Sequence, residues 1–72
     1  MKQAILTSSS GERMLIKVGK KVRWHQRGLN RYLEGKITKI ENPYNHTNHN
    51  MYKVTVKLNS GAVVNTRAWQ FL

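Results

Sequence analysis

The residues of this chain that could take part in acid–base chemistry are few and far apart. The only acids are Glu12, Glu34 and Glu41, and there is no cysteine. General acid–base catalysis needs two titratable groups that converge in one pocket, and this spacing does not support such a pair. Without cysteine there are also no disulfides and no thiolate metal ligands. We therefore expect no catalytic site and no cofactor.

The histidines offer the remaining candidate for metal chemistry. His46 and His49 form a His-x-x-His pair, and His25 is a conceivable third ligand. Three neutral imidazoles can hold zinc. The pair lies in an Asn-rich segment with no acid near it in the sequence, so we expect no metal site. Tyr44, His46 and His49 instead mark this segment as a candidate contact loop for a partner.

Positive charge dominates the composition. Thirteen Lys and Arg face three acids, which gives a net charge of +10 and a pI near 10.6. Solubility of a small domain needs a net charge of only about 2–8. An excess of this size attracts polyanions, among which nucleic acid is the commonest. The alternative is a set of solvated surface charges with no binding role.

Alternation of apolar and polar residues predicts the strands that position these cations. In Lys21–Gln26, Val22 and Trp24 point to one side while the cations point to the other. Met51–Leu58 alternates in the same way. Because the intervening strand also turns a lysine outward, an antiparallel meander of the three would place the cations on one outer face.

The strand predicted over Tyr32–Glu41 departs from strict alternation. Its apolar positions Ile37 and Ile40 are three apart rather than two. A bulge or bend near Thr38 and Lys39 would let the strand pass from one sheet to another. A helix would also explain the spacing, but Gly35 and the β-branched residues argue against it.

The remaining elements are shorter. With 72 residues the chain forms one domain. Residues 1–12 are a flexible or loosely paired lead, in which residues 2–7 are either a short strand or a frayed end, and residues 13–72 form the barrel. Further expected elements are a strand at 13–18, loops at 27–31 and 41–50, a turn at 59–61, a return strand at 62–66 and a helical turn at 67–71. Leu72 is expected to close the core.

These elements resemble SH3-like small β-barrels of the Tudor and KOW group. Gly19–Trp24 is similar to their opening strand, and Gly35–Ile40 to their bent second strand. Tyr52–Leu58 with Val63 and Val64 resembles their third and fourth strands, and Ala68–Leu72 their closing turn. The likeness covers about residues 17–72. It implies an all-β fold, an SH3-like barrel of about five short antiparallel strands with a terminal helical turn.

The resemblance leaves several functions open, because a fold does not determine a function. The group includes nucleic-acid binders, ribosomal and transcription modules, readers of methylated side chains and structural domains. A reader of methylated lysine or arginine needs an aromatic cage. Here Trp24 points into the core, acids are nearly absent and the charge would repel a cationic ligand. We therefore do not expect a methyl reader.

The candidate nucleic-acid contacts are the cations of the strands and of the loop between the first two of them. They are Lys21, Arg23, Arg27, Arg31, Lys36, Lys39, Lys53 and Lys57. Between residues 17 and 39, eight cations face a single acid. The two loop arginines flank Gly28-Leu29-Asn30 and can reach beyond the sheet to pair with phosphates.

Aromatic residues bear on the kind of nucleic acid. Single-stranded binders expose several rings on which bases stack. Here Tyr32 and Tyr44 are the only rings expected to be exposed, whereas the others (Trp24, Tyr52, Trp69 and Phe71) are expected in the core. No helix long enough for the major groove is predicted. The sequence thus favours a non-specific or shape-selective binder of duplexes, with DNA ahead of RNA.

Two other functions remain as alternatives. The chain could dock on an acidic protein, such as a nucleic-acid-processing enzyme, through the 42–50 loop. It could also be an oligomeric enzyme whose active site forms only between subunits. No membrane span or targeting segment is apparent, so we expect a cytoplasmic location, which could include the nucleoid. The oligomeric state is left open.

Overall fold

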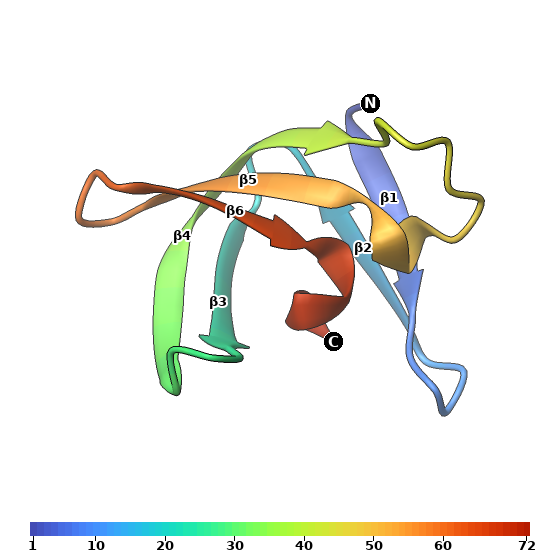
Figure 1. Cartoon of the computed structure of the whole chain (residues 1–72), viewed down its shortest axis with the longest axis horizontal. Coiled ribbons are helices and arrows are strands. Elements are labelled where there is room, and N and C mark those ends of the chain that lie inside the picture. Colours follow the sequence, from blue (N-terminus) through green and yellow to red (C-terminus); the bar gives the residue numbers. More distant parts are fainter.

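The computed structural model describes all 72 residues as six antiparallel strands in two sheets. The strands are β1 (Gln3–Thr7), β2 (Arg13–Lys17), β3 (Lys21–Gln26), β4 (Arg31–Glu41), β5 (Lys53–Leu58) and β6 (Val63–Arg67). β1 pairs with β2, and the other four form a meander in the order β3-β4-β5-β6 (Figure 1). The all-β class expected from the sequence is confirmed, and residues 13–72 contain five of the six strands.

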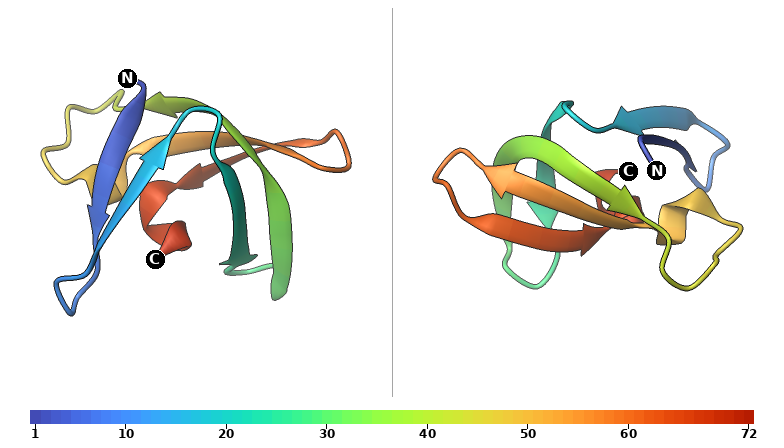
Figure 2. Two further views of the ribbon diagram at one scale, coloured as in Figure 1. Left: turned by 180° about the vertical axis from the view of Figure 1, so that it is seen from behind. Right: turned by 90° about the horizontal axis from the view of Figure 1, so that it is seen from above.

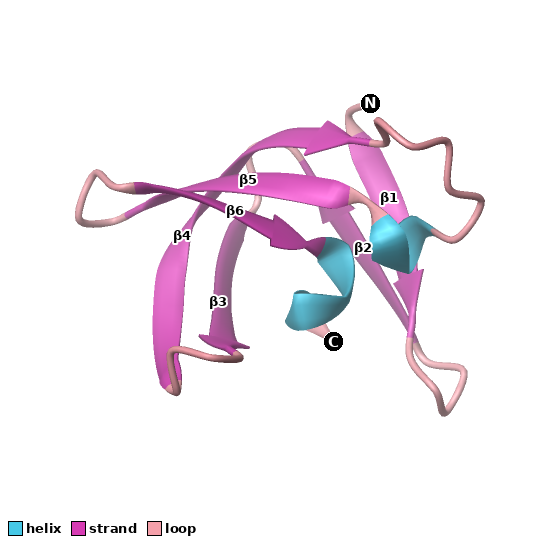
Figure 3. Ribbon diagram, viewed as in Figure 1, coloured by secondary structure: helices cyan, strands magenta, loops and turns pink.

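Helical structure is limited to two short 3-10 turns, η1 (His49–Met51) and η2 (Ala68–Phe71) (Figure 3). The second one confirms the helical turn predicted near the end of the chain, and Arg67 is its N-terminal cap. No helix in the structure combines the length and the apolar character needed to cross a membrane.

The first strand belongs to the common core. β1 and β2 align over five residue pairs, from Gln3 opposite Lys17 to Thr7 opposite Arg13. Ala4 and Leu6 point inward and are buried, since alternate residues of a strand face one side. Of the two alternatives for residues 2–7, the structure therefore has the strand. Figure 2 shows this hairpin lying across the open side of the bent sheet.

The long strand β4 is interrupted by one bulge. Its register against β5 shifts between Ile37 and Lys39, which confirms the predicted bulge. Before the bulge, the buried Gly35 lies opposite Leu58 of β5. A Cβ added there would lie 2.8 Å from the Cα of Leu58 and closer still to the carbonyl oxygen of Lys57. Only glycine fits this crossing without displacing backbone.

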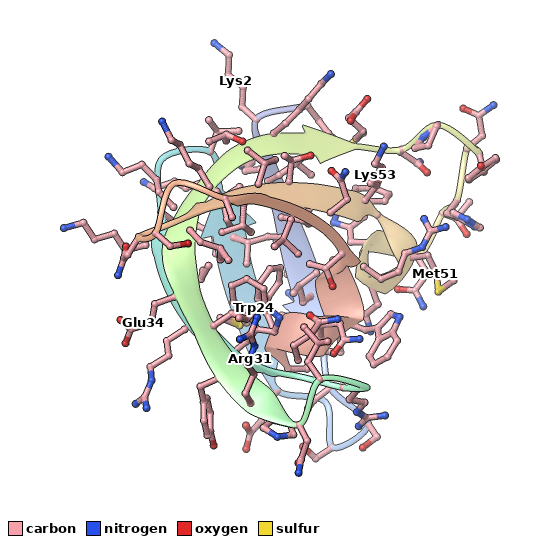
Figure 4. All side chains as sticks on the ribbon, turned by 60° about the vertical axis from the view of Figure 1, so that its left-hand side comes forward. Lys2, Trp24, Arg31, Glu34, Met51 and Lys53 are labelled. Atoms are coloured by element: carbon pink, nitrogen blue, oxygen red, sulfur yellow. The ribbon has the colours of Figure 1, made fainter.

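One hydrophobic core fills the space between the two sheets and η2. Trp24 lies in its interior (Figure 4) and is 3% exposed. Its ring meets that of Phe71 edge-on, with ring centres 5.0 Å apart. The buried hydrophobic residues are Ala4, Leu6, Ile16, Val22, Trp24, Leu33, Ile37, Ile40, Tyr52, Val54, Val56 and Ala68. The rings of Trp24 and Tyr52 are buried as the sequence predicted.

Two expectations about the end of the chain are wrong. Leu72 does not close the core but is 49% exposed, because it follows the last residue of η2. Trp69 is only half-buried. A short helical turn can direct only part of its side chains inward, and here the inward positions are Ala68, which is buried, and Phe71, which packs against the core.

Candidate nucleic-acid interface

Three lysines form a row across the outer face of the four-stranded sheet. Lys21 of β3 is directly opposite Lys36 of β4, and Lys36 is directly opposite Lys57 of β5. All three are exposed, since their strand neighbours Val22, Ile37 and Val56 take the inward positions. Neighbouring strands lie about 4.8 Å apart. We call this set the lysine row.

The lysine row carries charge without compensation. Like charges directly opposite each other destabilise a sheet. The structure contains only two ion pairs, Arg23 with Glu34 and Lys39 with Glu41, and neither involves the row. On β6 the row continues with Val63 opposite Lys57, an exposed apolar residue rather than an acid. The fold therefore keeps three adjacent cations free at a cost in stability.

Arg23 extends the row along β3 but is partly neutralised. Its Nε lies 3.3 Å from Oε1 of Glu34, and its guanidinium lies 4.7 Å from the centre of the Tyr32 ring. The other carboxylate oxygen of Glu34 accepts a 3.4 Å hydrogen bond from Asn59. Figure 4 shows Glu34 directed away from the core. Arg23 is thus held over an aromatic ring instead of extending freely into solvent.

Lys39 and Lys53 lie beyond the bulge, around the second acid. Lys39 Nζ lies 3.5 Å from Oε2 of Glu41, and Lys53 is opposite Glu41 on one side and Arg67 on the other. Their charges are closer to balance than those of the lysine row. The structure therefore divides the predicted face into a purely cationic part and a mixed part.

The two loop arginines flank the turn between β3 and β4. Gly28 and Asn30 there have φ of 91° and 51°, the left-handed conformation that glycine and asparagine tolerate best. Arg31 opens β4 and is exposed. The Arg27 guanidinium lies 5.2 Å from the centre of the Trp69 ring, and its backbone N–H donates to Gln70 Oε1 at 3.4 Å. The turn is thereby attached to η2.

The segment from Asn42 to Asn50 is held by side-chain hydrogen bonds at both ends. The Asn42 side chain donates to the His46 carbonyl at 2.7 Å and accepts from its N–H at 2.8 Å. At the other end, the Ile5 N–H donates to His49 Nδ1 at 2.9 Å, and Asn50 bonds both backbone groups of Thr7. These side chains cover the free edge of β1 in place of another strand.

Of the three candidate contact residues in this loop, only Tyr44 is largely exposed to solvent. Tyr44 is 70% exposed, and His46 is half-buried beside it with ring centres 6.1 Å apart. His49 stacks on Tyr52 at 4.7 Å, and its Nδ1 is occupied by the hydrogen bond to β1. The structure contains no cluster of three histidine or acidic side chains that could hold a metal ion.

Sequence reasoning missed the aromatic surface formed by Tyr32 and Trp69. Tyr32 is 61% exposed as predicted, but Trp69 was assigned to the core. The two rings come from β4 and η2, and each lies next to an arginine. The signal for Trp69 was weak, because a four-residue turn has no repeating pattern to indicate which side faces inward.

Comparison of the chain with family models, with curated proteins and with solved structures found no match.

Proposed function

We propose that this protein binds duplex nucleic acid, DNA ahead of RNA, by contacting the phosphate backbone with the lysine row. The observation that carries the proposal is the register of Lys21, Lys36 and Lys57, which places three unpaired cations side by side. Such an arrangement costs stability in the free protein. A polyanion that neutralises the row removes this cost and releases counterions.

The lysine side chains and the short helices support recognition of the nucleic-acid backbone rather than of the bases. Lysine contacts phosphate as a point charge on a flexible stem, and a contact to phosphate carries no sequence information. The only helices are two turns of three and four residues, too short to enter a major groove. Binding is therefore non-specific or governed by the shape of the duplex.

The composition of the row is the reason for placing DNA ahead of RNA. Proteins that recognise RNA duplexes commonly bond the 2′-hydroxyl groups. The lysine row has only donors and ends in the apolar Val63, so it has no side chain that accepts a hydrogen bond from a 2′-hydroxyl group. A cytoplasmic location, in association with the nucleoid, is part of the same proposal.

The test is a salt titration of duplex binding by the triple variant Lys21→Gln/Lys36→Gln/Lys57→Gln. Log affinity falls with log salt, and each phosphate contact contributes about 0.9 to the steepness of this fall. Loss of three contacts should therefore make the slope shallower by about 2.7. Between about 50 and 200 mM salt the wild type should then lose about 40-fold more affinity than the variant. Fluorescence anisotropy with labelled duplex measures both slopes.

The matched control is Lys2→Gln/Arg13→Gln/Lys17→Gln, which removes the same charge from the β1–β2 side. None of these three side chains forms an ion pair or a side-chain hydrogen bond. The control should keep most of the wild-type slope. Equal losses in both variants would mean that only net charge matters and that the lysine row is not a site. Absence of duplex binding would favour an acidic protein as the partner.

A further inference from the structure

A pocket of about 350 Å³ lies between the β3–β4 turn and η2, next to the lysine row. It is lined by the rings of Trp24, Tyr32, Trp69 and Phe71 together with Arg23, His25, Arg27, Gln70 and Leu72. Pockets for small ligands range from about 300 to 1,000 Å³, so its volume is at the lower end. We call it the aromatic pocket.

The lining combines aromatic rings with arginine planes. Arg23 lies against Tyr32 and Arg27 against Trp69, while His25 meets Tyr32 edge-on with ring centres 5.3 Å apart. Of the five surface pockets in the structure, this one alone has more than one aromatic residue in its lining. Rings and guanidinium planes are the two kinds of side chain on which unpaired bases stack.

The charge of the aromatic pocket selects the class of ligand. Two guanidinium groups already interact with its rings, so a cationic ligand such as a methylated lysine would be repelled. A planar group that carries a phosphate would gain both stacking and ion pairing. Gln70 uses only its carbonyl oxygen within the protein, which leaves its amide N–H groups to donate to the edge of a base.

Arg23 lies between the aromatic pocket and the lysine row. Arg23 lines the pocket, and Lys21 lies two residues before it on the same face of β3. Same-face residues recur about every 6.6–6.8 Å along a strand. A nucleic-acid strand that follows the row can therefore reach the pocket over a short distance.

We propose that the aromatic pocket binds an unpaired nucleobase, at a single-stranded end or gap next to a duplex held by the lysine row. This inference deepens the proposed function and depends on it for the duplex part. Tyr32 and Trp69 stack on the base, and Arg23 and Arg27 contact its phosphates. The protein then prefers a junction between double and single strands over an uninterrupted duplex.

The experiment compares a blunt duplex with the same duplex carrying a short single-stranded overhang, and with one whose overhang has the same phosphates but no bases. Stacking of one base contributes about tenfold in affinity. We expect the base-bearing overhang to bind about tenfold more tightly than the abasic one. Tyr32→Leu and, separately, Trp69→Leu should remove this ratio and leave blunt-duplex binding unchanged. Tyr32 is the safer variant for folding, because most of its side chain is exposed.

The lysine-row variant separates this inference from the proposed function. It should weaken binding to all three ligands and keep the ratio between the base-bearing and abasic overhangs. A wild-type ratio of one, with blunt-duplex binding intact, would overturn the aromatic pocket and leave the proposed function standing. A tenfold base-dependent ratio on a free single strand, with no duplex binding, would support the pocket and overturn the duplex function.

Discussion

The lysine row and the aromatic pocket lie next to each other but are built in opposite ways. In the row, three flexible cations repel one another and contact no ring or acid. In the pocket, each arginine is held against an aromatic ring, and one of them is also paired with Glu34. In the proposals made above, the row recognises only charge, whereas the pocket also recognises a planar group. The two regions therefore differ in whether their cations are free or held against rings, although both carry positive charge.

The largest expected effect is a loss of stability in Gly35→Ala, which should disturb both regions because β4 supplies residues to each. Its Cβ would collide with the backbone of Lys57 and Leu58, and such overpacking costs about 1–3 kcal/mol or more. For a domain of this size, each kcal/mol lowers Tm by about 4–8 °C. Thermal unfolding followed by circular dichroism measures the loss. An unchanged Tm would mean that β4 and β5 separate easily at this crossing.

A smaller effect of opposite sign is expected from Lys36→Glu, the central position of the row. A carboxylate there would attract Lys21 and Lys57 instead of repelling them, which should raise stability by about 1 kcal/mol. Duplex affinity should fall in the same variant. Lys36→Gln is the matched control, with a smaller gain. A lower Tm in Lys36→Glu would show that the row is not repulsive.

The smallest effect should come from Arg27→Lys, which keeps the charge but loses the plane that lies against Trp69. The guanidinium plane of Arg27 can also stack on the bound base, and such a cation–π contact contributes about 0.5–1 kcal/mol, so affinity for a base-bearing overhang should fall about two- to fivefold. Affinity for a blunt duplex should not change. Arg31→Lys on the other side of the turn is the control. Equal losses of affinity for both ligands would mean that Arg27 contacts the duplex, as the lysine row does, and not the unpaired base.

Much of the fold could be predicted because strand patterns are local. The alternation in Lys21–Gln26 identified Val22 and Trp24 as inward, and the spacing of Ile37 and Ile40 located the bulge. Leu33, buried opposite Trp24, was not recognised as a core residue. It lies on the same face as Gly35, which has no side chain and so interrupts the hydrophobic pattern.

The candidate site could be predicted only as a set of cations. Lys21, Lys36 and Lys57 were all expected outside, but their alignment depends on the register of two strand pairs. Which arginines are neutralised depends on long-range contacts such as that of Asn59 with Glu34. The role of His49 at the edge of β1 was also invisible, since the two segments are 44 residues apart.

The sequence by itself determined that this protein is a small all-β domain with a strongly cationic outer face, because alternation and net charge are properties of short segments and of composition. Only the tertiary structure decided which lysines form a row, which arginines are held and where Trp69 lies. The aromatic pocket is lined by residues of the β3–β4 turn and of η2, and Arg27 and Gln70 in these two segments are 43 residues apart in the sequence. Contacts of this kind are set by the packing of the whole core, and no local pattern encodes them.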